Sequence, residues 1–239
     1  MKKLKKKNFY ENFITGDLIN LCIPNEKAII KDGWAEWFND IKNLSATKHG
    51  IFPNNRAKQF SILNSLANDK SKIVLMICDK SSSNAIGVIS LQNIDFQQKS
   101  AEIAVNISKM NNQIISPFGT LEAMALITEH GFEVAGLHRI YGGQAYPQLS
   151  SWNKMIEIIG FKSEGITRKS FVRGMKIQDK VHFACHYDFY LKLKNIRGSL
   201  WGSTKIIKSI MKKQPKISFA KKIDKKVSEE EKKHFSFLF

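Results

Sequence analysis

Three side chains that commonly bind metals lie within five residues of one another in the second half of the chain. They are His182, Cys185 and His186. Side chains alternate between the two faces of a strand, so residues 182 and 186 would share one face and Cys185 would point to the other. Such an arrangement does not bring three ligands to one ion. The sequence therefore predicts no metal cofactor at this position.

The cysteines of the 239-residue chain stand at positions 22, 78 and 185 and form no C-x-x-C pair. This odd number and wide spacing argue against a disulfide framework and favour a reducing compartment. No apolar run approaches the roughly 20 residues that a membrane-spanning helix needs. The basic residues 1–7 are not followed by the apolar segment of a secretory signal. We expect a soluble, cytoplasmic protein.

The elements that must position any functional group alternate along the chain. Hydrophobic periodicity and turn residues predict a hairpin of two strands joined at 80–84, and later a closing antiparallel pair. The predicted strands cover 17–23, 73–78, 85–91, 101–107, 138–145, 161 onward and 181–193, and the predicted helices 27–38, 53–67, 119–134 and 147–159. Adjacent strands followed by helix–strand–helix–strand predict a mixed α/β sheet.

Short sequence pieces stand out on these elements. They are Gly87–Leu91, Glu102 on the next strand, Glu122-Ala123 and Gly131–Glu133 in one helix, Arg139 and Pro147, Gly160–Gly165, Arg168, Gly174 and Asp179. In this order they resemble the GNAT acetyltransferase superfamily, and most of all its RimJ/RimL-type branch, over about residues 13–193. The resemblance implies an α/β (α+β) GNAT fold with a central mixed, mostly antiparallel twisted sheet flanked by helices. It also implies acetyl transfer from acetyl-CoA to a primary amine.

The segment before the hairpin is rich in aromatic residues and includes Gly33-Trp34, Trp37 and Asn39-Asp40. It is similar to PseH-like GNAT enzymes, which acetylate nucleotide-linked amino sugars for surface glycans. This similarity implies that Trp34 and Trp37 bind the substrate, although their i, i+3 spacing also suits core aromatics. Protein N-termini or ribosomal targets, as in RimJ/RimL-like enzymes, are the alternative acceptors.

The resemblance places a carboxylate base on strand 101–107, and Glu102 is the matching residue. It would take the proton of the acceptor ammonium directly or through a water. The family often has a tyrosine four residues before the Gly-Phe pair to protonate the departing thiolate, but here that residue is Ile156. RimJ/RimL-type proteins can use a serine on the same helix, which implies Ser150 or Ser151. Tyr146 is a further candidate, with core packing as its alternative role.

A loop from Ser108 to Thr120 leads into a predicted helix where the family binds the pyrophosphate of coenzyme A. Free amide N–H groups and the helix dipole would hold that anion. The family's Gln/Arg-x-x-Gly-x-Gly/Ala pattern is absent, and the longer loop reads Ile115-Ser116-Pro117-Phe118-Gly119. The expected coenzyme-binding residues are Ile107, Ser108, Ser116, Phe118, Gly119, Thr120 and Asn153. If the altered loop has lost the coenzyme, the alternative is a degenerate scaffold that binds RNA or membrane.

The formal charge of +17 is concentrated at the two ends of the chain. Residues 1–8 include five lysines, and residues 195–239 contain 12 basic and 4 acidic side chains, which leaves +4 for residues 9–194. Nucleic acid is therefore not the expected partner of the central body. We expect a basic arm at 1–12, a GNAT domain at 13–195 and a basic tail at 196–239.

The tail contains a predicted basic amphipathic helix in which Ile206, Ile207, Ile210 and Met211 alternate with lysines. Helices of this kind bind anionic lipid surfaces. We expect the tail to hold the protein at the inner face of a membrane. A flexible tail and docking in a homodimer are the alternatives.

Overall fold

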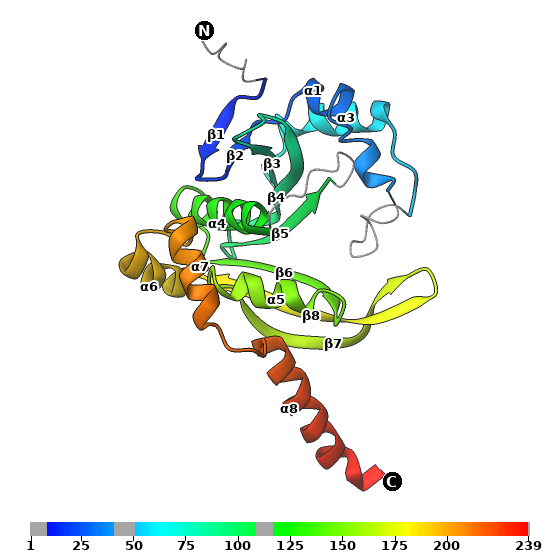
Figure 1. Ribbon diagram of the computed structural model, residues 1–239. Coiled ribbons are helices and arrows are strands. Elements are labelled where there is room, and N and C mark those ends of the chain that lie inside the picture. Colours follow the sequence, from blue (N-terminus) through cyan, green and yellow to red (C-terminus); the bar gives the residue numbers. More distant parts are fainter. Residues whose placement is uncertain (1–8, 41–50, 109–116, 239) are drawn as a thin grey trace. The chain divides into compact units, whose positions relative to one another are not determined.

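A computed structural model describes residues 9–40, 51–108 and 117–238 of the chain (Figure 1). The chain divides into two units, Met1–His138 and Arg139–Phe239. Each unit has its own antiparallel strands and its own helices, and every strand pairing within a unit is antiparallel. The predicted α/β fold with mostly antiparallel strands flanked by helices is confirmed.

The strands of the first unit pair in sequence order. They are β1 (Asn12–Thr15), β2 (Ile19–Cys22), β3 (Ile73–Asp79), β4 (Ala85–Asp95) and β5 (Ser100–Ile107). The middle of β3 and most of β4 are buried, because each is a nearly continuous apolar run covered on both faces. Both strands of the predicted hairpin are confirmed, and β4 runs four residues further than expected. Strand β1 was not predicted.

The described residues of the first unit also form the helices α1 (Glu26–Ile30), the 3-10 helix η1 (Glu36–Phe38), α3 (Arg56–Leu66) and α4 (Pro117–Glu133). Helix α4 packs across the strands β2 to β5 with an almost wholly buried, apolar sequence (Figure 1). The single helix predicted over 27–38 is wrong. Helix α1 ends at Ile30, and Gly33, with φ +77° in the left-handed region, lets the chain turn before η1 begins.

The second unit has three strands in the order β6-β8-β7, with β6 at Arg139–Tyr146, β7 at Lys162–Arg173 and β8 at Lys176–His186. Its helices are α5 (Ser150–Glu157), α6 (Tyr187–Arg197), α7 (Thr204–Lys213), α8 (Phe219–His234) and the short 3-10 helix η2 (Phe235–Leu238). Helix α5 is followed by Gly160 at φ +91°, the left-handed residue that the sequence predicts at this helix end.

The strand predicted over 181–193 is only half correct, because β8 ends at His186 and α6 follows directly. Phe189, Tyr190 and Leu193 recur at helical spacing, and Tyr190 is fully buried. Gly198, with φ +86°, closes this helix by donating its N–H to the Lys194 carbonyl at 2.7 Å. The predicted boundary between residues 195 and 196 therefore falls inside α6.

Most of the C-terminal tail is helical and packs on its own unit. The predicted helix near 206–211 is present as α7, with Ile207 fully buried, whereas α8 was not predicted. Helix α8 lies against β7 and α5 (Figure 1). Within the described residues no helix combines the length and apolar character required to cross a membrane.

Candidate functional site

The predicted base, Glu102, lies near the start of β5 and is half-buried. It pairs with Gln92 across the β4–β5 ladder. Its Oε2 accepts a hydrogen bond from Asn93 Nδ2 at 3.2 Å, and Asn93 has φ +51° inside β4, where the β4–β5 register shifts between Gln92 and Asp95. The carboxylate is thus oriented by one neighbouring amide and keeps accessible surface. A carboxylate with these properties can accept a proton, so the role of Glu102 stays a prediction with suitable local geometry.

The predicted pyrophosphate-binding segment is described at its two ends. Ser108 follows β5, is buried and donates its N–H to the Ile86 carbonyl at 2.8 Å. Ser116 lies outside the described residues. Phe118, Gly119 and Thr120 form the first turn of α4, where backbone N–H groups have no acceptor within the helix. This helix start is a place where an anion can bind.

Gly119 has a packing role that the sequence did not reveal. A Cβ at this position would come within 3.2 Å of Ile19 Cγ2. The glycine therefore lets the start of α4 approach β2 closely. Ile107, the remaining candidate in this unit, lies opposite Gly87, where a Cβ would approach the Asn106 carbonyl oxygen to 2.7 Å. Both glycines support close packing around the ends of β5 and α4.

Glu122 is a fully buried acid that the sequence marked only as part of the resemblance. Its carboxylate accepts hydrogen bonds from three consecutive backbone N–H groups, those of Asp17 and Leu18 (2.8 Å) in the β1–β2 turn and of Ile19 (3.2 Å) at the start of β2. Burial raises the pKa of Glu122, while these amides act in the opposite direction. The sequence signal that could have identified this role was an acidic residue among the apolar residues of a predicted helix. Glu122 fixes the turn to α4.

The two candidate substrate-binding tryptophans are core residues. Trp34 and Trp37 are both buried, in one cluster with Tyr10, Ile29 and other apolar side chains. Neither ring offers an exposed face to a sugar, which corrects the expectation of a stacking platform. The indole Nε1 atoms of both residues have no hydrogen-bond partner among the described residues. Any contact with a substrate through these N–H groups stays a prediction.

In the second unit, Asn153 is buried inside α5 next to Gln144 of β6. Gln144 Nε2 donates to Asn153 Oδ1, and also to the Leu149 carbonyl at 3.3 Å. Asn153 Nδ2 is a buried donor with no acceptor among the described residues. An unpaired buried donor costs free energy, about 1–3 kcal/mol. The amide is thus held by Gln144 with one donor group unused.

The serines predicted to act as acids begin the same helix. Ser150 is half-buried, Ser151 is exposed, and both occupy the first turn of α5. Leu149 is the cap residue of this helix and makes no side-chain capping bond. Neither serine is therefore committed to capping α5, and the acid role of each stays a prediction.

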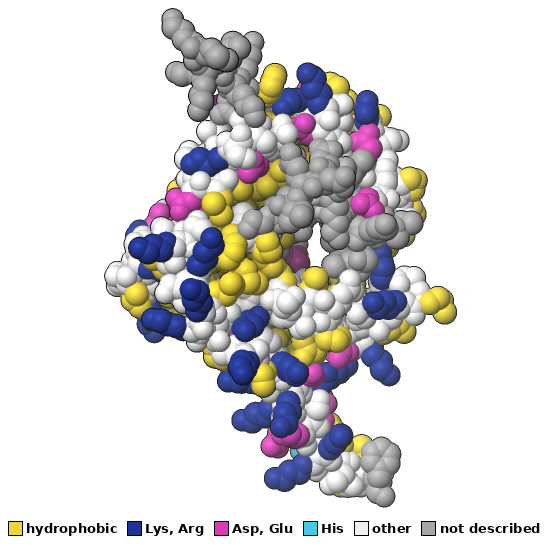
Figure 2. All heavy atoms as spheres, viewed as in Figure 1, with side chains coloured by type: hydrophobic (Ala, Val, Ile, Leu, Met, Phe, Trp, Pro, Cys, Tyr) yellow, Lys and Arg dark blue, Asp and Glu magenta, His cyan; other side chains and the backbone are white. Residues whose placement is uncertain are grey.

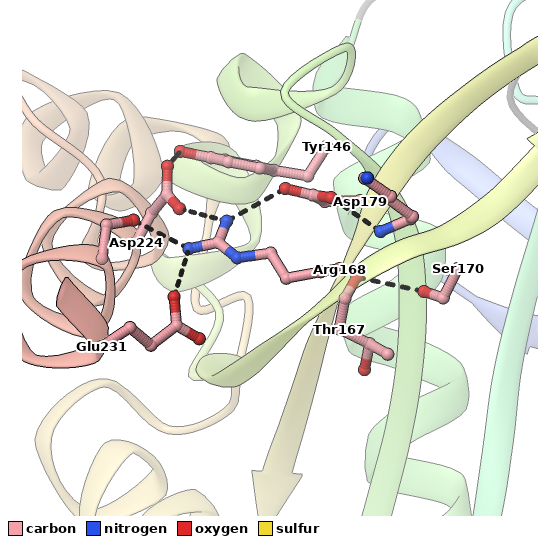
Figure 3. Close-up of polar contacts among 9 residues, drawn as sticks. Tyr146, Thr167, Arg168, Ser170, Asp179, Asp224 and Glu231 are labelled. Atoms are coloured by element: carbon pink, nitrogen blue, oxygen red, sulfur yellow. Dashed lines mark hydrogen bonds and ion pairs between the residues drawn. The ribbon is translucent and has the colours of Figure 1, made fainter. Parts of the chain in front are cut away.

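Tyr146, the third candidate acid, points toward the C-terminal helix (Figure 3). Its hydroxyl donates to Asp224 Oδ2 at 3.2 Å, and its ring is buried with Val181 and Ala220. Burial, and then the charge and hydrogen bond of Asp224, raise the pKa of Tyr146 to about 12. The proton is therefore held more firmly than in a free tyrosine, which makes this hydroxyl a weaker acid. Its catalytic role stays a prediction.

Arg168 links β7 to α8 beside Tyr146 (Figure 3). Its guanidinium pairs with Asp224 at 2.6 Å and with Asp179 at 3.0 Å, and it also donates to Ser228 Oγ at 2.8 Å. Glu231 lies at 3.9 Å. A planar guanidinium with several partners holds carboxylates in a defined geometry. This cluster fixes the tail helix to the sheet, and only the tertiary structure reveals it.

The histidines near the end of β8 have protein partners. His182 Nε2 lies 2.8 Å from Thr167 Oγ1, and His186 Nε2 lies 3.0 Å from Glu164 Oε1. Arg139 makes a two-pronged ion pair with Glu164, with both N–O distances 2.6 Å. Among the described residues no group of three or more His, Cys, Asp or Glu side chains is arranged to hold a metal ion.

Replacing Glu164 with Gln is expected to lower stability at neutral pH but not in strong acid. The Arg139 guanidinium, with help from His186, lowers the pKa of Glu164 to about 2. A lowered folded-state pKa contributes stability above the unfolded value near 4.5, and this is lost as the pH falls through about 2. Both side chains are about one-third exposed, so solvent reduces the effect to about 1 kcal/mol.

Urea unfolding followed by circular dichroism at pH 6.5 and pH 2.5 measures this effect. The control is Glu230→Gln, which changes an exposed acid on α8 of the same unit. It should leave the free energy of unfolding unchanged at both pH values. Equal losses for Glu164→Gln at the two pH values would contradict the assignment.

Solved structures of several acetyltransferases are similar to this fold. No protein-family model matches the chain, and no curated protein matches it in sequence. Spermidine N-acetyltransferase from Vibrio cholerae, solved with CoA and spermine, is 18% identical with TM-score 0.61, over 74% of this chain and 99% of that chain. RimJ from Mycobacterium smegmatis, solved with CoA-disulfide, is 14% identical with TM-score 0.61, over 71% and 82%.

The microcin C7 self-immunity acetyltransferase MccE, solved with acetyl-CoA and AMP, is similar to the same extent. It is 19% identical with TM-score 0.58, over 72% of this chain and 93% of that chain. Three acetyltransferases from different biological settings thus share the fold of this chain. The expected GNAT fold is confirmed.

Proposed function

We propose that this protein is an N-acetyltransferase that uses acetyl-CoA to acetylate a primary amine. The observation that carries the proposal is Asn153 Nδ2, a buried donor without an acceptor among the described residues. Coenzyme A has amide carbonyls in its pantetheine arm, which are acceptors of the kind that this donor lacks. The fold shared with three acetyltransferases supports the same assignment.

The start of α4, in the first unit, suits an anionic group such as a pyrophosphate. Its first N–H groups and the positive end of the helix dipole favour a pyrophosphate, as at other phosphate-binding helix starts. We assign Ile107, Ser108, Ser116, Phe118, Gly119 and Thr120 to this contact. Bound acetyl-CoA would supply the acetyl group as a reactive thioester.

The chain's own residues would handle the protons of the transfer. Glu102 would accept the proton of the acceptor ammonium, which leaves a neutral amine to attack the thioester. Ser150, Ser151 or Tyr146 would hand a proton to the departing thiolate. Positioning alone can lower the barrier of such a reaction substantially, so the base is expected to matter more than the acid.

The favoured acceptor is a nucleotide-linked amino sugar. The support for this acceptor is the similarity of the segment with Gly33-Trp34, Trp37 and Asn39-Asp40 to GNAT enzymes that acetylate nucleotide-linked amino sugars. A RimJ-like acceptor, the amino terminus of a protein, is the second candidate and is favoured by the likeness to RimJ. A thiol-release screen of UDP- and dTDP-linked amino sugars against N-terminal peptides and polyamines distinguishes these classes.

Calorimetric titration with CoA tests the proposal directly. Asn153→Leu, which keeps the side-chain size and removes the donor, is expected to weaken CoA binding about 5- to 10-fold, the value of one hydrogen bond. The variant also removes the Oδ1 acceptor of Gln144, which keeps its bond to the Leu149 carbonyl, so the free energy of unfolding without coenzyme should fall by only about 1 kcal/mol.

Asn195→Leu on α6 is the matched control, because this asparagine is exposed in the same unit. A purely structural Asn153 would show the reverse pattern, with lower stability and unchanged affinity. If the wild-type chain does not bind CoA at all, the protein is better described as a degenerate acetyltransferase scaffold that binds RNA or membrane.

The proposal also includes the redox compartment and the oligomeric state of the protein. The cysteines at positions 22, 78 and 185 are buried and form no disulfide bond, which suits a reducing compartment such as the cytoplasm. A homodimer is the proposed assembly, and size-exclusion chromatography with light scattering measures it.

A further inference from the structure

The second unit contains a long stretch of chain without an acidic side chain. Between Asp188 and Asp224 there are ten Lys and Arg residues and no Asp or Glu. Figure 2 shows basic side chains gathered over α6, α7 and the beginning of α8, with hydrophobic side chains among them. Concentrated positive charge of this kind binds polyanions in a salt-dependent way.

Helix α7 presents its lysines on one side. Ile207 is fully buried, and by helical geometry four lysines lie on the opposite side. These are Lys205, Lys208, Lys212 and Lys213. Lys205, Lys212 and Lys213 form no ion pair with any described residue, and the same holds for Lys216 and Lys221 further along. Their charge is therefore available to a partner.

Two large apolar side chains project from the turn that joins α7 to α8. Ile217 is 49% exposed and Phe219 is 50% exposed, whereas the intervening Ser218 is buried. Lys216 and Lys221 flank them in sequence. The turn thus places apolar groups in solvent directly beside unpaired cations.

Hydrogen bonds fix this turn to the rest of the unit. The exposure of Ile217 and Phe219 therefore follows from the fold of the unit. The Phe219 N–H donates to Glu157 Oε1 at 2.7 Å, and Ser218 Oγ accepts from the Lys221 N–H at 3.3 Å to cap α8. Gln214 donates to the Lys154 carbonyl and to Glu157 Oε2. These bonds fix the turn to α5 and leave the Ile217 and Phe219 side chains pointing outward.

We propose that this α7–α8 surface binds an anionic lipid membrane. The surface consists of Lys205, Lys208, Lys212, Lys213, Lys216, Ile217, Phe219 and Lys221. Lysines attract acidic headgroups while apolar side chains enter the boundary with the acyl chains, and both are needed for stable interfacial binding. RNA would use the lysines but would leave the aliphatic Ile217 in water, so lipid is the better match. The proposal does not depend on acetyl transfer.

Co-sedimentation of the full chain with vesicles tests it. Binding is expected to phosphatidylcholine vesicles that contain phosphatidylserine, to weaken at high salt and to be absent with phosphatidylcholine alone. The triple variant Lys212→Glu, Lys213→Glu, Lys216→Glu should lower the partition coefficient about 100-fold, since each lysine near such a surface contributes about fivefold. The variant Ile217→Ser, Phe219→Ser should lower it about tenfold while the salt dependence remains.

The matched control is Lys58→Glu, Lys70→Glu, Lys176→Glu, which changes the net charge equally at exposed positions outside this surface. It should bind vesicles like the wild type, and circular dichroism melting verifies that all variants fold. Equal losses in the control, no effect of the Ile217 and Phe219 changes, or binding to single-stranded RNA in place of vesicles would each overturn the proposal.

Discussion

Replacing Glu102 with Gln is expected to lower kcat/KM about 10²- to 10⁴-fold at neutral pH, the usual contribution of a positioned general base. The substitution keeps the size of the side chain, and its amide can still contact Asn93. What it removes is the ability to take a proton from the acceptor ammonium. Steady-state thiol release, with the acceptor that the screen identifies, measures the loss.

The pH profile separates this role from a structural one. Without the base, the variant depends on amine that is already neutral, so its kcat/KM should rise about tenfold per pH unit until the amine is deprotonated. CoA affinity should remain that of the wild type. Glu11→Gln, at an exposed position of the same unit, is the control and should keep full activity. Full turnover of Glu102→Gln at neutral pH would show that another group, or water, takes the proton.

Replacing Glu122 with Ala is expected to destabilise the first unit by about 3–5 kcal/mol, because three backbone N–H groups lose their acceptor in a dry environment. These donors, in Asp17, Leu18 and Ile19, would be left beside the apolar surface of α4. Chemical unfolding followed by tryptophan fluorescence measures the change, since Trp34 and Trp37 lie in the core of this unit.

The sign of the pH dependence gives a second check on Glu122. Burial raises its folded-state pKa, so its contribution to stability is full below the unfolded value near 4.5 and declines as the pH rises through the folded value. The difference between wild type and variant should therefore be larger at pH 4 than at pH 7. Glu133→Ala, at the exposed end of α4, should cost less than about 0.5 kcal/mol. A similarly small loss for Glu122→Ala would rule out its role in fixing the turn.

Elements whose pattern is local were predictable from the sequence. The apolar run of β3, the turn and return of β4, the alternation in β5 and the long apolar helix α4 each carry their own periodicity. The order of these elements predicted a mixed α/β sheet, and the resemblance of short sequence pieces to GNAT acetyltransferases implied the particular fold. Errors arose where the local pattern was ambiguous, as for α6, whose apolar residues follow a buried strand without a break in hydrophobicity.

The candidate site was predictable only in part, because a residue type does not state what the side chain will touch. The sequence proposed Glu102 and Asn153, but the bond from Asn93 and the unused donor on Asn153 depend on the folded neighbours. Trp34 and Trp37 suited both a substrate platform and a core, and burial decided for the core.

The amino-acid sequence alone determined the class of fold, the concentration of positive charge in the tail and the candidate base. Tertiary structure alone decided which distant groups meet. Glu122 binds a turn more than 100 residues earlier in the chain, and Arg168 binds Asp224 across 56 residues. Such contacts leave no periodic trace in the sequence, because hydrogen-bond partners are chosen by proximity after the sheets and helices have packed. The firmly held turn that exposes Ile217 and Phe219 belongs to the same category.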